Sequence, residues 1–338
     1  MKIIVPMAGR GSRLRPHSLT TPKPLIAVAG TPIVHQLVHE IAKVVEQPIT
    51  AIGFILGDPA FFGADVEASL TSLAEELGAK PYLFRQEEPL GTGHAIMCAK
   101  ELLDGPAVVA YADTLIRADL ILDPNADGVI WVKQVENPEA FGVVELDNEN
   151  RIVNLIEKPQ TFLSDLAVIG IYYFKEIGRL KNALSQVVSK QLKKGEEYQI
   201  NEGILMMMKE GAVFKPGEVE AWMDCGNPTA TIQTNSEMLA YKYAEEEALI
   251  DPSARIENST LIPPCFIGAK AVIEDSILGP GVSIGSNTKI SNCTLKNSLI
   301  QNNSRIKNLV SEKAMIGNHV HYNGNHTFVS IGDYSELQ

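Results

Sequence analysis

An α/β domain followed by a parallel β-helix is the fold class that the sequence predicts, and three observations lead to it. The first part of the 338-residue chain alternates short apolar runs with stretches of helical spacing, an order that predicts helices packed on a largely parallel sheet. Beyond residue 249, isoleucines recur at six-residue intervals. The length also favours two hydrophobic cores over one. We therefore expect two domains.

The N-terminal elements are short and well separated. Strand-like apolar runs are KIIVP (2–6), TAIGFIL (50–56) and PYLFRQ (81–86). Residues 61–78 have helical spacing, and residues 105–113 (GPAVVAYAD) predict a buried strand that ends at Asp113. Ligands collect at the carboxyl ends of parallel strands. The loop after residues 2–6 and the acidic end of this later strand should both lie there.

From Gly128 the pattern changes to strands with fewer helices. Strand-like runs are residues 128–135, 140–146, 151–159 and 166–174, and helical spacing returns at residues 180–194, 201–209 and 229–248. A different kind of sequence follows the last of these stretches. The predicted division is a first domain at 1–228, a connecting helix at 229–248 and a second domain at 249–338.

The C-terminal part contains a hexapeptide repeat. Isoleucines spaced by six residues, such as Ile284 and Ile290 or Ile300 and Ile306, are separated by small and polar residues. Such a repeat indicates a β-helix, in which each short strand forms one face of a coil and the recurring aliphatic side chain stacks inward. An ordinary strand-rich domain would show a period of two. The period is lost from Asn318, so we expect the last residues to cap the coil.

The composition restricts the class of ligand. A formal net charge of −12 and a pI near 5.1 argue against a broad nucleic-acid or membrane surface. No apolar run is long enough to span a bilayer or to form a signal peptide, and the four cysteines form no C-x-x-C pair. We expect a cytoplasmic protein with reduced cysteines. Five basic residues nevertheless precede Glu40, the first acidic residue, which indicates a local site for a small anion.

The opening loop, AGRGSRL (8–14), follows a strand, and its glycines let backbone amides approach anionic oxygens. It lacks the ending of a P-loop and the third glycine of a dinucleotide-binding fingerprint. Further chemistry-bearing groups are the ammonium of Lys23, the amide of Gln86, the carboxylates of Asp113 and Asp224, and the Glu157–Lys158 pair. Two carboxylates from distant parts of the chain could share a Mg²⁺ ion.

These motifs together resemble the sugar-1-phosphate nucleotidyltransferases, the enzymes that make nucleotide sugars. The motifs read GRGSRLRP, PKP, QEEPLGT, YAD, FGVVE, EKP and WMDCG, and they occur in the family's order between Met1 and Gly226. The hexapeptide tail is also common in that family. The resemblance implies a Rossmann-like, mixed-sheet nucleotidyltransferase domain followed by a left-handed parallel β-helix, and a chain that assembles as a homo-oligomer without nucleic acid or membrane partners.

The resemblance also implies roles for individual residues, with Arg13, Lys23 and Asp113 at the centre of catalysis. The nucleoside triphosphate would bind Ala8, Gly9, Gly11, Ser12, Arg13, Lys23, Gln86, Gly91 and Thr92. The sugar phosphate would bind Gly142, Glu157, Lys158 and Val168, and Mg²⁺ would bind Asp113 and Asp224. The attacking phosphate oxygen is already ionised near neutral pH, so this chemistry requires no general base.

Neither the base nor the sugar follows from these motifs. Transfer of a thymidylyl or uridylyl group from dTTP or UTP to glucose-1-phosphate is the favoured prediction. The stretch GTGHA (91–95) is more similar to the uridylyltransferases that act on N-acetylglucosamine-1-phosphate than to the thymidylyl branch. A Gln86 amide could serve either pyrimidine.

Two alternative functions remain open. His319 and His321, with His326 nearby, would share one face of a strand if a strand forms there, and such histidines act as general bases in β-helix acyltransferases. A bifunctional uridylyltransferase and acyltransferase acting on an amino-sugar phosphate is therefore an alternative. The other alternative is a non-catalytic regulatory subunit that binds nucleotide sugars, which would be expected to lack Arg13, Lys23 or one of the metal-binding aspartates.

Overall fold

The computed structural model describes residues 1–45, 47–118, 122–190 and 196–325, and these residues fall into two units. The first unit contains Met1–Ile26 and Pro32–Gly226. The second unit contains the residues from Asn227 onward together with Ala27–Thr31. These five early residues belong with the C-terminal unit, whereas the sequence predicted them in the first domain.

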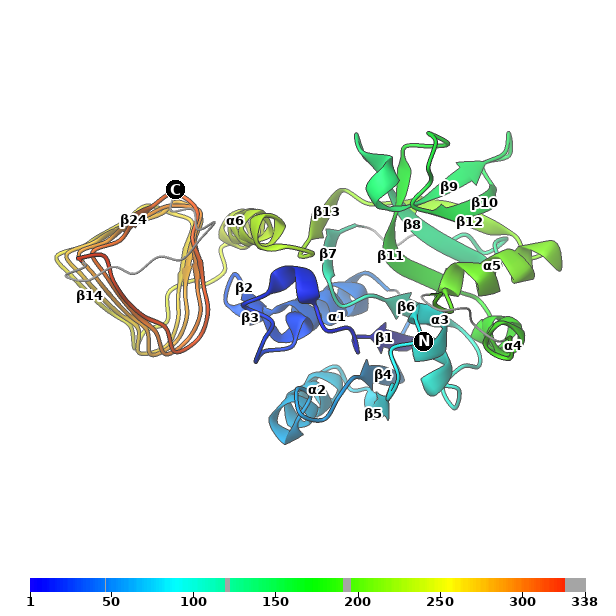
Figure 1. The fold of residues 1–338 in the computed structure, drawn as a ribbon, viewed down its shortest axis with the longest axis horizontal. Coiled ribbons are helices and arrows are strands. Elements are labelled where there is room, and N and C mark those ends of the chain that lie inside the picture. The colour runs from blue at the N-terminus through cyan, green and yellow to red at the C-terminus, as the bar shows by residue number, and fades with distance from the viewer. Residues whose placement is uncertain (46, 119–121, 191–195, 326–338) are drawn as a thin grey trace. The chain divides into compact units, whose positions relative to one another are not determined.

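A nine-stranded mixed sheet forms the centre of the first unit (Figure 1). Its strands are β1 (Lys2–Pro6), β4 (Ala51–Leu56), β5 (Lys80–Arg85), β6 (Ala107–Ala110), β8 (Gly128–Gln134), β9 (Gly142–Leu146), β10 (Ile152–Glu157), β11 (Leu166–Phe174) and β12 (Phe214–Glu218). The order is β10-β9-β11-β6-β1-β4-β5, with β8 paired to β11 and β12 paired to β8. Strands β6, β1, β4 and β5 are parallel, and β11 pairs antiparallel to β6.

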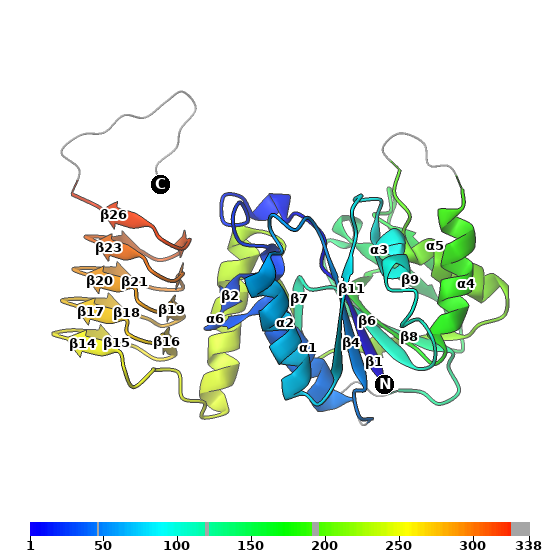
Figure 2. The same ribbon diagram turned by 90° about the horizontal axis from the view of Figure 1, so that it is seen from below.

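Helices cover both faces of this sheet (Figure 2). On one side lie α1 (Ile33–Val44) and α2 (Ala64–Glu76), and on the other α3 (Thr92–Cys98), α4 (Ile177–Val188) and α5 (Ile200–Lys209). The central strands are therefore apolar on both faces, as in β4, whose six residues AIGFIL are all buried. Ile96, Leu184 and Ile204 from the second group of helices pack into one core with Ile4 and Val109 of the sheet.

The order in which successive strands are added to the sheet reverses at β1. It runs from β1 to β4 and β5 on one side and then returns to β6 on the other side of β1. The loops after β1 and β6 therefore diverge from neighbouring strand ends, which is the position where open α/β sheets bind ligands. Strand β6 ends at Ala110 rather than at the predicted Asp113, although the Tyr111 amide still donates to Gly170 O of β11 at 2.9 Å.

The second unit begins with α6 (Pro228–Ala244), capped by the Asn227 side chain, and continues as a triangular coil of short strands (Figure 1). Three parallel stacks form its faces: β14-β17-β20-β23-β26, β15-β18-β21-β24 and β16-β19-β22-β25. Their strands are Arg255–Glu257, Thr260–Leu261, Cys265–Ile267, Val272–Glu274, Ile277–Leu278, Val282–Ile284, Lys289–Ser291, Thr294–Leu295, Leu299–Ile300, Arg305–Lys307, Val310–Ser311, Met315–Ile316 and His321–Asn323, numbered β14 to β26 in chain order. The hexapeptide repeat thus corresponds to a β-helix-like coil.

The coil continues further than the sequence predicted. His321–Asn323 forms β26 and pairs in register with β23, so that Tyr322 stands beside Ile306 in the column that Ile273 and Ile290 occupy in earlier coils. The expected cap from Asn318 is therefore wrong as far as Asn323. The aromatic ring at an aliphatic position concealed this last repeat.

A buried amide explains why residues 27–31 join the second unit. Asn235 of α6 is fully buried, and its Oδ1 accepts hydrogen bonds from Ala29 N at 2.9 Å and Ser283 Oγ at 2.7 Å. Its Nδ2 donates to Gly281 O at 3.2 Å. Three segments that are distant in sequence are thus joined by one side chain. These residues include the short hairpin of β2 (Ala27–Val28) and β3 (Thr31–Pro32).

Among the helices in the described ranges, none combines the length and the apolar character that crossing a bilayer requires.

Candidate active site

The loop after β1 contains the predicted phosphate-binding residues. Gly11 adopts a left-handed conformation with φ of 59° immediately before the 3₁₀ helix Ser12–Leu14. A Cβ atom at Gly11 would lie only 2.8 Å from Lys23 Cβ. Ala8, Gly9 and Ser12 accompany it in this loop, and the Ser12 and Arg13 side chains are exposed. The glycine is therefore needed both for its backbone conformation and for the close approach of the Lys23 stem.

Replacing Gly11 with alanine should displace the Lys23 side chain. Because misplacing a phosphate-binding group by about 1 Å can cost about 10²-fold in rate, we expect kcat/KM for the nucleoside triphosphate to fall by roughly that factor. Steady-state kinetics would measure it. Gly78→Ala is the matched control, because Gly78 has a similar φ of 69° but a Cβ atom there would meet nothing within 4 Å. Equal effects of both substitutions would show that backbone strain alone is responsible.

Lys23 lies at the centre of a charged cluster. Its side chain is 9% exposed, and its Nζ lies 3.0 Å from Asp113 Oδ2. Asp113 precedes β7 (Thr114–Arg117), which pairs antiparallel with β13 (Ala221–Asp224) so that Asp224 stands opposite Thr114. The Cys225 amide also donates to Asp113 O at 3.0 Å. The β7–β13 ladder thus brings together two carboxylates that are more than a hundred residues apart in sequence.

The electrostatics of this cluster suit a divalent cation. Burial raises the pKa of the Asp224 carboxyl, and the charge of Asp113 raises it further, whereas Lys23 and Arg13 lower it. A carboxylate that is half-buried beside another carboxylate gains from a cation between them. No cluster of three or more His, Cys, Asp or Glu with metal-binding geometry occurs in the described ranges. Asp113 and Asp224 fit Mg²⁺ as a pair, because one or two carboxylates are commonly what Mg²⁺ takes from a protein when phosphates supply other ligands.

Gln86 and the start of α3 form a second group. Gln86 follows β5 and is 8% exposed. Its Nε2 donates to Gly91 O at 3.0 Å and lies 3.1 Å from His94 Nδ1. Gly91 has φ of 102° and packs against the Tyr198 carbonyl, while the Thr92 hydroxyl donates to Gln199 Oε1 and accepts from Ile200 N, both at 3.1 Å. The Nε2 atom of Gln86, the residue that the resemblance assigns to base recognition, is thus held by Gly91 and His94.

The residues predicted to face the sugar phosphate lie on β9, β10 and β11. Gly142 and Glu157 are paired in the β9–β10 ladder. Lys158 follows with φ of 45°, its amide bonded to Phe141 O at 3.0 Å and its Nζ 3.7 Å from Glu157 Oε1. Val168 is the last residue of β11 before a register irregularity against β8. Both charged side chains are exposed, so the ion pair contributes little to stability.

Tyr111 was not identified from the sequence. Its buried hydroxyl has no hydrogen-bond partner within the described residues. Burial raises the pKa of Tyr111, with the charges of Asp113 and Glu157 acting in the same direction, and Thr92 is also a neighbour. Tyr111 therefore contributes a buried, protonated hydroxyl next to Thr92 and Tyr172, near enough to Asp113 and Glu157 for their charges to act on it. The sequence signal that could have identified Tyr111 is its position in the YAD motif, between a buried strand and Asp113.

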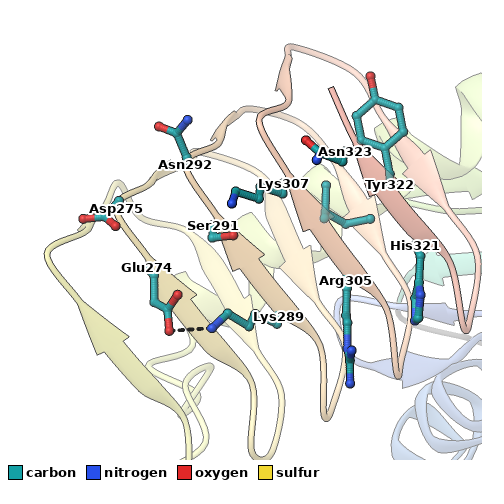
Figure 3. Close-up of a pocket in the computed structure, with 11 residues that line it drawn as sticks. Glu274, Asp275, Lys289, Ser291, Asn292, Arg305, Lys307, His321, Tyr322 and Asn323 are labelled. Atoms are coloured by element: carbon teal, nitrogen blue, oxygen red, sulfur yellow. Dashed lines mark hydrogen bonds and ion pairs between the residues drawn. The ribbon is translucent and has the colours of Figure 1, made fainter. Parts of the chain in front are cut away.

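The β-helix-like coil carries a separate pocket (Figure 3). His321 lines it beside Arg305, its register partner on β23, and Lys289 pairs with Glu274 Oε1 at 2.7 Å. His319 lies outside β26 in a left-handed turn with φ of 59°, so the expectation that His319 and His321 share one strand face is wrong. His321 has no carboxylate partner within the described residues. His326 lies outside those residues.

Comparisons with known proteins show the family to which the chain belongs. Residues 2–240 match the profile of the family described as Nucleotidyl transferase. A glucose-1-phosphate thymidylyltransferase of Streptomyces antibioticus is 30% identical over 366 aligned positions, which cover 100% of this chain and 99% of that protein. A protein of Methanococcus vannielii named bifunctional protein GlmU is 26% identical, over 91% of this chain and 76% of its own length.

A solved structure also resembles a large part of the chain. It is a Bacillus anthracis protein provisionally named a glucose-1-phosphate thymidylyltransferase, in complex with a sucrose, at 25% sequence identity. The superposition has a TM-score of 0.60 and covers 70% of this chain and 94% of that one. The predicted resemblance is thereby confirmed. With a profile match that spans most of its length and a relative aligned from end to end, the chain belongs to the nucleotidyl transferase family.

Proposed function

We propose that this protein transfers a nucleotidyl group from a nucleoside triphosphate, with dTTP or UTP favoured, to a sugar-1-phosphate, with glucose-1-phosphate favoured. An oxygen of the sugar phosphate attacks the α-phosphorus, a new P–O bond forms, and the bond to the β-phosphate breaks to release pyrophosphate. The observation that carries this proposal is the convergence of Lys23, Asp113 and Asp224 at the carboxyl edge of the sheet, with Arg13 close enough to affect Asp224.

The charges of the cluster match the needs of this reaction. Two polyanions must meet in line, so the main contributions to catalysis are positioning and charge neutralisation. Arg13 and Lys23 would bind the triphosphate, and Glu157 and Lys158 would bind the sugar and its phosphate. Asp113 and Asp224 would hold Mg²⁺, which when bound supplies positive charge to the phosphate oxygens.

The other properties follow as proposals from the same resemblance. Residues 1–228, apart from 27–31, would form the catalytic domain, 229–248 the connecting helix and 249–338 a left-handed β-helix. We expect a cytoplasmic homo-oligomer that binds neither nucleic acid nor membranes. The similarity to proteins named GlmU leaves N-acetylglucosamine-1-phosphate as the competing acceptor.

Pyrophosphate release by the purified protein tests this function. With Mg²⁺, each of four nucleoside triphosphates would be combined with glucose-1-phosphate or N-acetylglucosamine-1-phosphate. We expect one pyrimidine nucleotide and one sugar phosphate to dominate, and Asp113→Ala to abolish release. Asp104→Ala is the control, since Asp104 is an exposed carboxylate that pairs with Lys2. Release that is absent from every combination, or that persists in Asp113→Ala, would contradict the proposal.

A further inference from the structure

One face of the coil changes, along its length, from paired charges to hydrogen-bond donors. This face is the stack β14-β17-β20-β23-β26, in which the register places side chains above one another in two outward columns. In the earlier coils the second column carries glutamates, and each pairs with a cation of the first column. Arg255 pairs with Glu257. Lys289 pairs with Glu274 at 2.7 Å, so the charges in this part of the face are neutralised within the chain.

The later coils lack these carboxylates. The register continues the first column with Arg305 and His321, and the second column with Ser291, Lys307 and Asn323. Within the part of the chain that the structure describes, neither Arg305 nor Lys307 forms an ion pair. The two cations are two residues apart on one strand face, a spacing of about 6.6 Å along β23. Like charges so placed are unfavourable unless an anion lies between them.

These donors line one hollow (Figure 3). Its volume is about 510 Å³, which lies within the range of small-molecule sites. Arg305 and His321 lie side by side on neighbouring strands. The acidic side chains of the hollow, Glu274 and Asp275, lie at its opposite end, and Glu274 is already paired with Lys289. The end of the hollow formed by β23 and β26 is therefore cationic and rich in donors.

We propose that this hollow binds a phosphate group through Arg305 and Lys307. The further donors would be the hydroxyl of Ser291, the imidazole N–H of His321 and the amide of Asn323. A guanidinium can donate to two phosphate oxygens at once, and a phosphate group brings three strong acceptor oxygens and a charge near −2. A carboxylate brings only two oxygens. A long polyanion would be repelled by the rest of the chain, whose formal net charge is −12.

Three kinds of small molecule share this chemistry: inorganic phosphate, pyrophosphate and a sugar phosphate. A ligand that binds only the folded coil lowers its local opening by a factor of 1 + [L]/Kd, which is about tenfold when the ligand concentration is ten times Kd. The amide of Arg305 would report this change, because it donates to Val320 O of the last coil at 2.8 Å. All of the proposed contacts come from the second unit, so the inference does not depend on the proposed function.

Hydrogen exchange of the full-length protein, followed by mass spectrometry, tests the proposal. Separate samples would contain inorganic phosphate, pyrophosphate or glucose-1-phosphate without Mg²⁺, and a further sample would contain sodium chloride at matched ionic strength. Peptides within residues 303–325 report on the hollow, and peptides within residues 8–23 report separately on the loop after β1. We expect at least one phosphate compound to slow exchange in 303–325 by about tenfold at ten times its Kd, and chloride to have little effect.

Two double variants separate a specific site from a general effect of charge. Arg305→Gln combined with Lys307→Gln removes both proposed contacts and should abolish the protection of residues 303–325. Lys296→Gln combined with Lys313→Gln removes the same two charges from the same coil but outside the hollow, and it should keep the protection. All four side chains are exposed, so both variants should fold, which circular dichroism would check.

Four results would overturn the inference: no protection of residues 303–325 by any phosphate compound, equal protection by chloride, protection that persists in the variant at 305 and 307, or protection that is lost equally in the variant at 296 and 313. Protection by one compound alone would support the site and identify its ligand. The two sets of peptides keep the proposals apart. Protection of residues 8–23 without 303–325 would overturn the site on the coil and leave the proposed function standing.

Discussion

Substituting Lys23 with methionine should lower kcat by about 10²–10³-fold, the loss that follows removal of one preorganised electrostatic group in other active sites. Methionine keeps much of the stem that packs beneath Gly11 but removes the charge that pairs with Asp113 at 3.0 Å. Asp113 is 41% exposed and remains solvated without its partner, so the fold should persist. Pyrophosphate-release kinetics would measure kcat, and circular dichroism would monitor folding.

A lysine away from the cluster provides the comparison. Lys100 is exposed just after α3, and the described residues show no ion pair for it. Lys100→Met should therefore leave kcat within about twofold, since surface substitutions rarely matter. A folded Lys23→Met enzyme with near wild-type turnover would rule out a role for Lys23 in binding the phosphates.

Substituting Asn235 with leucine should destabilise the second unit by about 3–5 kcal/mol. Leucine has a similar volume but leaves the Ala29 amide, the Ser283 hydroxyl and the Gly281 carbonyl without their bonds in a buried place, at about 1–3 kcal/mol for each group. Urea unfolding would measure the change in free energy. Hydrogen exchange should show that the Ala29 amide loses its protection, because Asn235 is its acceptor.

The control lies on the same helix. Gln233 of α6 is exposed and bonds only to Glu237 among the described residues, so Gln233→Leu should change the unfolding free energy by less than about 0.5 kcal/mol. Protection at Ala29 that survives in Asn235→Leu would show that the segment 27–31 is held by its other contacts. These include the bond from Gln301 Nε2 to Ala27 O at 2.9 Å.

Some of the architecture was predictable because it depends on local sequence. A β-helix-like coil needs an aliphatic side chain at each inward position, and that requirement appears directly as a six-residue spacing between Ile267 and Ile273 and between Ile284 and Ile290. The strand and helix order of the first unit was visible for a similar reason, since burial on both faces demands continuous apolar runs. The family motifs in turn indicated the chemistry of the opening loop.

Other features depend on contacts between distant residues, and periodicity carries no signal for these. The pairing of β7 with β13 brings Asp224 beside Asp113, and Asn235 draws residues 27–31 into the second unit. Tyr322 concealed the last repeat because an aromatic ring replaced the expected aliphatic side chain.

The sequence by itself determined the two-part architecture, the coil and the set of residues that could bind phosphates and a metal. The tertiary structure alone decided how those residues are oriented. It placed the hydroxyl of Tyr111 among the predicted site residues, paired Lys23 with Asp113 and joined the Gln86 amide to Gly91 and His94. The physical reason is that hydrogen bonds and ion pairs form between residues that are close in space. Periodicity and composition show only whether a local segment is apolar, polar or charged.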